Sequence, residues 1–216
     1  MQALRHWGPR YIRDRLAVMS YQRMHPDAPW LTAHAISILS TWIKPTDAGP
    51  EWGSGRSTVW FARRAQRSPI AGRDAQWGAN VPAMLAQAGL GDKVEYYVFP
   101  DGTSESSSSH YVRVIDEFAP ESLDFVLVDG VCRDHCALAC LDKLKPGGLV
   151  IVDNVNWYVA RDPKSRAPNS RGLENGPASG GWELFASRVN SWRLVWTTNG
   201  LWDTAFWVKP SAENTL

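Results

Sequence analysis

Two apolar segments of the chain end in residues that carry oxygen ligands. Residues 123–129 end in Asp129, and residues 149–153 end in Asp153, which Asn154 follows. If the segments are adjacent strands, the carboxylates and the amide converge at one edge of a sheet, where their oxygens suit a divalent ion such as Mg²⁺. The other interpretation is that the two aspartates cap loops or touch a cofactor without a metal.

A glycine-rich turn lies upstream of these residues and contains Glu51, Gly53, Gly55 and Ser57. Glycine has no Cβ atom, so the backbone of this turn can bend tightly and approach a ligand. Open α/β sheets bind ligands at the carboxyl ends of their strands, where this turn is expected. A plain strand-to-helix turn would use the same residues. The dinucleotide fingerprint requires a third glycine where this chain has Thr58.

An alternation of strand-like and helix-like segments positions these residues. Candidate strands are residues 47–52, 68–71, 94–99, 123–129 and 149–153, and candidate helices are residues 57–66, 80–88, 108–118 and 133–144. This order predicts parallel strands with helices on both faces of the sheet. Apolar runs at 192–198 and 204–208 flank Asn199-Gly200, which is typical of a hairpin turn. We therefore expect an α/β fold with a doubly wound, mostly parallel sheet that ends in an antiparallel hairpin.

The first 44 residues have a helical pattern. Residues 11–24 place Ile12, Leu16 and Met19 on one side of a helix, and residues 31–43 show a similar spacing. We expect an N-terminal helical cover at residues 1–44, a ligand-binding domain at 45–210 and a short tail at 211–216.

The composition indicates which classes of binding partner to expect and in which cellular compartment the protein is located. The 216 residues are 44% hydrophobic, which is enough for one sizeable core. With 23 basic and 22 acidic residues and no long run of either sign, no nucleic-acid partner is expected. No apolar run approaches the roughly 20 residues that span a bilayer, so no membrane partner is expected either. The three cysteines are spaced four residues apart, at Cys132, Cys136 and Cys140, which is typical of one face of a helix and not of a disulfide framework. We therefore expect a reducing, cytoplasmic location.

Glu51, Gly53, Gly55 and Ser57 resemble motif I of the class I S-adenosylmethionine-dependent methyltransferases, in which an acidic residue and two spaced glycines precede a small hydroxyl residue. The resemblance in element order extends to about Lys209. It implies a Rossmann-like, seven-stranded sheet and S-adenosylmethionine as the cofactor. Glu51 would lie near the amino-acid part of that cofactor, with the glycines against it.

Asp129 with Asp153 and Asn154 resembles the metal site of catechol-type and caffeoyl-CoA-type O-methyltransferases. The resemblance implies a metal that holds and deprotonates a hydroxyl beside the methyl donor, with Asp129 facing the reacting centre and the cofactor. Those relatives often have a lysine base three residues after the first aspartate, where this chain has Cys132, followed by Arg133. We expect Arg133 either to bind an acidic substrate or to cap a strand end.

Two further cofactor contacts follow from the resemblance. The position where many relatives hold both ribose hydroxyls with an acidic residue is Gly72 here, and Asp74 is the expected substitute. Asp101 and Gly102 match the place where the family often holds adenine, although a surface turn would look the same.

These observations together predict a methyltransferase that acts on a small molecule, first at a hydroxyl oxygen, with nitrogen left open. The alternative is a non-catalytic binding or assembly module that kept the fold and lost the cofactor site, which Gly72 and the missing lysine motivate. A nicotinamide-dependent oxidoreductase is a third hypothesis, against which Thr58 and the hairpin argue. His110 and His135 are further candidates for a general base.

Two regions are expected at the surface. The long segment at 155–181 is either a substrate lid or disordered. Four tryptophans either pack in the core or form an exposed face through which copies of the chain would pair as a homo-oligomer. They are Trp192, Trp196, Trp202 and Trp207.

Overall fold

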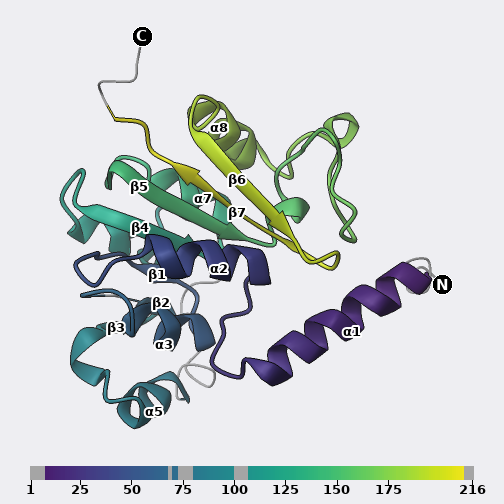
Figure 1. The fold of residues 1–216 in the computed structure, drawn as a ribbon. Coiled ribbons are helices and arrows are strands. Elements are labelled where there is room, and N and C mark those ends of the chain that lie inside the picture. The colour runs from purple at the N-terminus through teal and green to yellow at the C-terminus, as the bar shows by residue number, and fades with distance from the viewer. Residues whose placement is uncertain (1–7, 68–69, 73–79, 100–106, 212–216) are drawn as a thin grey trace.

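The computed structural model describes residues 8–67, 70–72, 80–99 and 107–211 (Figure 1). It is an α/β structure built on a seven-stranded sheet with the order β3-β2-β1-β4-β5-β7-β6. The strands are β1 (Glu51–Trp52), β2 (Ile70–Gly72), β3 (Tyr96–Val98), β4 (Leu123–Val128), β5 (Leu144–Asp153), β6 (Arg193–Thr198) and β7 (Asp203–Val208). The pairs from β3 to β5 are parallel, and β7 pairs antiparallel with both β5 and β6. The Rossmann-like α/β class and the antiparallel C-terminal hairpin are thus confirmed.

Helices lie on both faces of the sheet. The α-helices are α1 (Pro9–Met24), α2 (Ala33–Trp42), α3 (Arg56–Ala62), α5 (Asn80–Gln87), α6 (His110–Arg113), α7 (Arg133–Ala139) and α8 (Gly180–Arg188). Short 3₁₀ turns are η1 (Gly91–Lys93), η2 (Val114–Glu117), η3 (Val155–Trp157) and η4 (Leu173–Asn175). Side chains of α2 and α3 pack in one core cluster, and those of α6, α7 and α8 pack in a second cluster.

Strands β4 and β5 divide their side chains between these two clusters. Because successive residues of a strand point to opposite faces, Val126 and Val150 face one cluster while Leu127 and Ile151 face the other. All four side chains are fully buried. This explains why the segments are apolar at every position, and it fixes where each strand ends and its polar residues begin.

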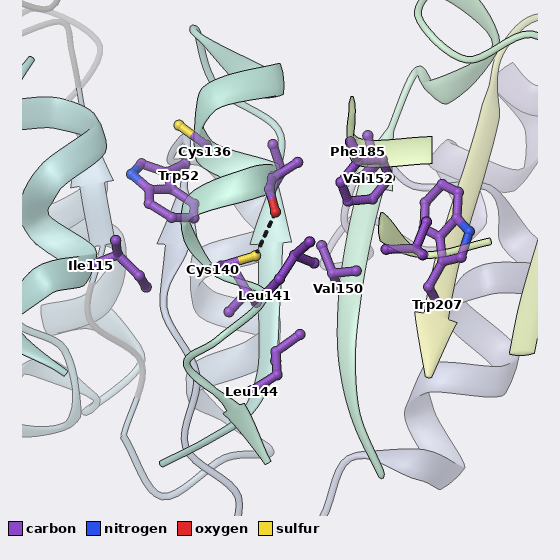
Figure 2. Close-up of a cluster of buried hydrophobic side chains, with 14 of the residues drawn as sticks. Trp52, Ile115, Cys136, Cys140, Leu141, Leu144, Val150, Val152, Phe185 and Trp207 are labelled. Atoms are coloured by element: carbon purple, nitrogen blue, oxygen red, sulfur yellow. Dashed lines mark hydrogen bonds between the residues drawn. The ribbon is translucent and has the colours of Figure 1, made fainter. Parts of the chain in front are cut away.

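The three cysteines lie along one face of α7, as the four-residue spacing predicts. Cys136 and Cys140 are buried in the cluster with Trp52 and Leu141 (Figure 2), whereas Cys132 at the start of the helix is half-buried. The Cys140 thiol donates to the carbonyl of Ala137. None of the three forms a disulfide.

For the four tryptophans at the hairpin, the structure supports core packing over an exposed face. Trp207 is buried in the core, and Trp192, Trp196 and Trp202 are half-buried. Trp192 and Trp196 pack against the same cluster as Trp207, because the hairpin pairs with β5 and is covered by α8. These side chains therefore serve mainly to pack the hairpin.

The two N-terminal helices differ in their relation to the sheet. Helix α2 packs Ile36 and Leu39 against it. Helix α1 has no buried residue, and Leu16 on its apolar side is exposed, whereas Tyr21 is half-buried and packs against the same cluster as α2. It lies beside the hairpin turn, as shown by the close approach of Asp14 to the turn glycine. Within the described residues, no helix is long and apolar enough to cross a membrane.

Candidate functional site

The glycine-rich turn connects β1 to α3 and is organised around the buried carboxyl group of Glu51. Ser57 donates its hydroxyl to this group, and Thr58 Oγ1 donates to the other oxygen at 3.0 Å. Thr58 Oγ1 also accepts from the backbone N–H of Gly55 at 3.1 Å. Burial raises the pKa of Glu51 to about 8, although the two hydroxyls favour the ionised form. The carboxyl group is therefore mainly protonated at neutral pH.

The two glycines of the turn have different surroundings. Gly53 has a φ of +109°, and a Cβ atom there would lie 3.1 Å from the backbone of Asp129 and Gly130. The backbone conformation and the neighbouring strand end both favour glycine at this position. Gly55 is in an extended conformation, and a Cβ atom there would meet no atom within 4 Å. The open space beside Gly55 is therefore available to a ligand.

Arg133, at the start of α7, connects the carboxyl ends of β4 and β5. Its Nη2 atom lies 2.9 Å from the carbonyl oxygen of Asp129 and 3.0 Å from the carboxylate of the same residue. Its Nη1 atom donates to the carbonyl of Asp153 at 2.5 Å and to Oδ1 of Asn154 at 3.2 Å. Its Nε atom donates to the carbonyl of Gly130 at 2.8 Å. Of the two roles expected for Arg133, these contacts support the cap of strand ends.

The carboxylates of Asp129 and Asp153 have different partners. Asp129 faces Arg133, and its side chain is 26% exposed. Asp153 is buried and accepts a hydrogen bond at 2.6 Å from Oγ1 of Thr204 in β7. Burial raises the pKa of both carboxyl groups, and the charge of Asp129 raises that of Asp153 further, while Arg133 opposes both shifts. The strand ends therefore place the two aspartates close together, but in separate hydrogen-bond networks.

A divalent ion does not fit these residues as they are arranged. The amide oxygen of Asn154 and one carboxylate oxygen of Asp129 already serve the guanidinium, and a carboxylate oxygen of Asp153 serves a hydroxyl. A metal ion would have to displace Arg133, because its ligands are the same oxygens. Within the described part of the chain, no group of three or more His, Cys, Asp or Glu residues is arranged to hold a metal.

Two cavities lie on either side of the end of β4. One, of about 260 Å³, is lined by the turn at Gly55 and Ser57, by Asp129 and by Trp30. The other, of about 390 Å³, begins at Gly130 and is lined by residues of α7 and of the segment after β5. A larger cavity of about 620 Å³ lies between α1 and residues 164–170, away from the strand ends. We take the two cavities beside β4 as the candidate site.

Aromatic and titratable side chains line the second cavity. Tyr158 stacks on Trp182 with ring centroids 5.2 Å apart, and the guanidinium of Arg133 lies 5.6 Å from the Tyr158 ring. Cys132 and His135 also line this cavity. An aromatic wall beside a titratable group suits a small, flat acceptor molecule.

The segment at 155–181 is folded against the sheet, so the expectation of disorder is not met. Asn156 is fully buried, and its amide nitrogen donates to the carbonyl of Pro168 and to the hydroxyl of Ser170, each at 3.1 Å. Its amide oxygen accepts from the backbone N–H of Asp203 at 3.0 Å. At its end, Ser179 donates to Asp134 at the start of α7. The segment thus forms a fixed wall of the second cavity.

Most of the predicted site residues come together at this edge of the sheet. Glu51, Gly53, Gly55, Ser57, Asp129, Arg133, Asp153 and Asn154 lie at the ends of β1, β4 and β5. Gly72 lies in contact with Tyr96. Asp74, Asp101 and Gly102 lie outside the described residues, so the predicted ribose and adenine contacts stay predictions. His110 begins α6 and does not line either cavity beside β4.

Sequence reasoning missed two contributors to the site. Trp30 lines the first cavity from the segment before α2, and Arg56 lies over its ring at 6.0 Å. Thr204 holds Asp153 from β7, far away in the chain. No local motif identifies either residue, although the pairing of the predicted hairpin with β5 would have brought β7 next to Asp153.

The fold is shared with known methyltransferases of low sequence identity. No protein-family model matches the chain, and no curated protein matches it. An O-methyltransferase from Bacillus cereus, solved with SAH, is 17% identical with a TM-score of 0.59, over 91% of this chain and 90% of that one. The O-methyltransferase TomG from Streptomyces achromogenes, solved with SAM, is 18% identical with a TM-score of 0.58, over 88% and 86%. A methyltransferase from Geobacter sulfurreducens is 15% identical with a TM-score of 0.55, over 92% and 90%. At these identities the likeness concerns the fold.

Proposed function

We propose that the protein is an S-adenosylmethionine-dependent methyltransferase that acts on a small molecule, at a hydroxyl oxygen. The observation that carries the proposal is the pair of cavities on either side of the end of β4. The first includes the glycine turn, where a cofactor would bind, and the second has room for an acceptor. Solved structures of the same fold that bind SAM or SAH support the choice of cofactor.

In the first cavity, the turn would hold the cofactor through its backbone and through Glu51. S-adenosylmethionine would supply an electrophilic methyl group to an acceptor oxygen and leave as S-adenosylhomocysteine. Glu51 is mainly neutral because burial raises its pKa to about 8. A cationic ammonium group bound nearby favours the ionised carboxylate, so cofactor binding would draw the proton from Glu51. Asp129 lines the same cavity and would contact the cofactor from the side of β4.

In the second cavity, the protein would orient the acceptor and take its proton. Tyr158 and Trp182 offer a flat wall, and the segment at 155–181 forms part of the cavity wall. His135 lines the cavity and is a residue type suited to general-base catalysis. Holding the two reactants in line can lower the barrier by roughly 7–11 kcal/mol, so positioning is the main contribution of such a protein.

Calorimetric titration of S-adenosylmethionine into the purified protein tests the cofactor proposal. We expect micromolar binding by the wild type and its loss in Gly53→Val, because a side chain there would crowd the backbone of residues 129 and 130. Gly180→Ala is the control, since a Cβ atom at that position meets no neighbour within 4 Å. A folded wild-type protein that does not bind the cofactor would contradict the proposal.

Transfer of a labelled methyl group to a panel of small phenols and amines tests the acceptor atom. We expect labelled ethers from the phenols and a loss of activity in His135→Ala that His135→Gln does not rescue. Exclusive labelling of the amines would place the reaction at nitrogen and overturn the choice of oxygen.

A further inference from the structure

We propose that the guanidinium of Arg133 takes the place of a divalent cation at the ends of β4 and β5, so that this site holds its oxygens together without a metal. The inference concerns the site of the proposed methyl transfer, and only its relevance to catalysis rests on that function. The arrangement itself follows from contacts within the chain.

The first argument is that all three nitrogen atoms of the Arg133 side chain contact oxygen atoms of the two strand ends. Arginine carries five N–H donors in a planar fork and stays charged at all ordinary pH values. Nε uses one donor, and Nη1 uses two, on Asp153 and Asn154. Nη2 donates to the carbonyl of Asp129 and forms an ion pair with the carboxylate of the same residue. The fork is thus bound on all sides, as a metal ion would be by its ligands.

The second argument is charge and burial. The Arg133 side chain is 13% exposed, and the carboxylate of Asp129 balances its charge at 3.0 Å. The carboxyl group of Asp153 points to a different partner, because Thr204 Oγ1 accepts from the backbone N–H of Thr32 and directs its own proton to Asp153. A doubly charged ion at this place would face a fixed guanidinium with one opposing carboxylate, which disfavours its binding.

The third argument is the origin of the partners. The guanidinium contacts two residues that follow β4 directly and two at the end of β5, and these strands are parallel neighbours. A cation that bridges these two strand ends fixes the orientation of Asp129 toward the first cavity. Arg133 is therefore a positioning residue, whose donors are already used within the chain.

Titration with Mn²⁺, followed by electron paramagnetic resonance, tests the proposal. The wild type and the Arg188→Ala control, which removes an exposed ion pair with Asp142 at the end of α8, should leave the spectrum of the free ion unchanged. Arg133→Ala should bind Mn²⁺ at least about tenfold more tightly than the wild type, because the oxygens of Asp129, Asp153 and Asn154 then lack their cation.

Two results would overturn the proposal. One is a wild-type site that binds Mn²⁺ and is weakened about tenfold by Asp153→Asn. The other is a folded Arg133→Ala protein that binds the ion no better than the wild type does. If Arg133→Ala does not fold, Mn²⁺ binding by the wild type and by Asp153→Asn still shows whether the site holds a metal ion. Binding of S-adenosylmethionine is measured on the same samples, so a failure of the proposed function is seen separately from a failure of this inference.

Discussion

Glu51 and Asp129 lie at the ends of the neighbouring parallel strands β1 and β4, yet their carboxyl groups are accommodated in different ways. Glu51 has only neutral partners, two hydroxyls from the first turn of the next helix. Asp129 is paired with the guanidinium of Arg133. Hydrogen bonds hold the carboxyl group of Glu51, which burial keeps protonated. An ion pair with Arg133 holds the carboxylate of Asp129.

The difference shows how each site depends on the fold. The partners of Glu51 follow it by six and seven residues, so this network forms wherever the strand, the turn and the helix form. The partners of Arg133 come from the ends of two strands, and one of them, Asp153, is 20 residues away from Arg133 in the sequence. This network therefore requires the sheet to be assembled. The first site is local in sequence, and the second exists only in the complete sheet.

Removal of the guanidinium should have the largest effect on stability. Arg133→Ala leaves the carboxylate of Asp129 and the amide oxygen of Asn154 without their cation, and we expect a loss of about 3 kcal/mol in the free energy of unfolding. Chemical denaturation measures this change. Arg188→Ala should cost about 0.5 kcal/mol or less, because its ion pair is exposed. Equal losses in the two variants would mean that Arg133 is no more important than a surface residue.

The neutral network at Glu51 should show itself through pH. The pKa of Glu51 rises from 4.5 to about 8 on folding, so unfolding releases a proton between these values. Stability should then fall as the pH rises through that window. Glu51→Gln has no proton to release, so relative to this variant the wild type should lose about 2 kcal/mol between pH 5 and about pH 6.5. Parallel pH dependences of the two melting temperatures would show that Glu51 is ionised in the folded chain.

The smallest effect should separate the two glycines of the turn. Gly53→Ala places a Cβ atom on a backbone with a φ of +109° and close to Asp129, and we expect it to cost about 1 kcal/mol. Gly55→Ala should be neutral for stability, because its conformation is extended and the space around it is open. Thermal denaturation of the two variants tests the difference, and a larger loss in Gly55→Ala would contradict it.

Much of the fold was predictable because its strongest signals are local. Examples are the apolar runs at β4 and β5 and the turn at Asn199-Gly200. The structure of each of these segments depends mainly on residues that are close to one another in the sequence. Apolar spacing alone was misleading for α1, where Leu16 is exposed because no other element of the described structure covers that side.

The site was predictable in its members and less so in its contacts. The strand ends identified Asp129, Asp153 and Asn154, but the sequence did not reveal that Arg133 already binds oxygens from all three residues. The pairing of Asp153 with Thr204 depends on the register of β7 against β5, which no pattern in the sequence specifies.

The buried thiols at α7 can report how often the core cluster around them opens. Cys136 and Cys140 are fully buried, and burial raises the pKa of the Cys136 thiol further above its usual range. An alkylating reagent reaches them only when α7 separates from the sheet, so their rate of labelling reports how often the folded chain opens there. Arg133 begins the same helix, so its contacts with the ends of β4 and β5 should keep α7 on the sheet for longer. Weaker contacts of Arg133 would then appear as faster labelling of the thiols.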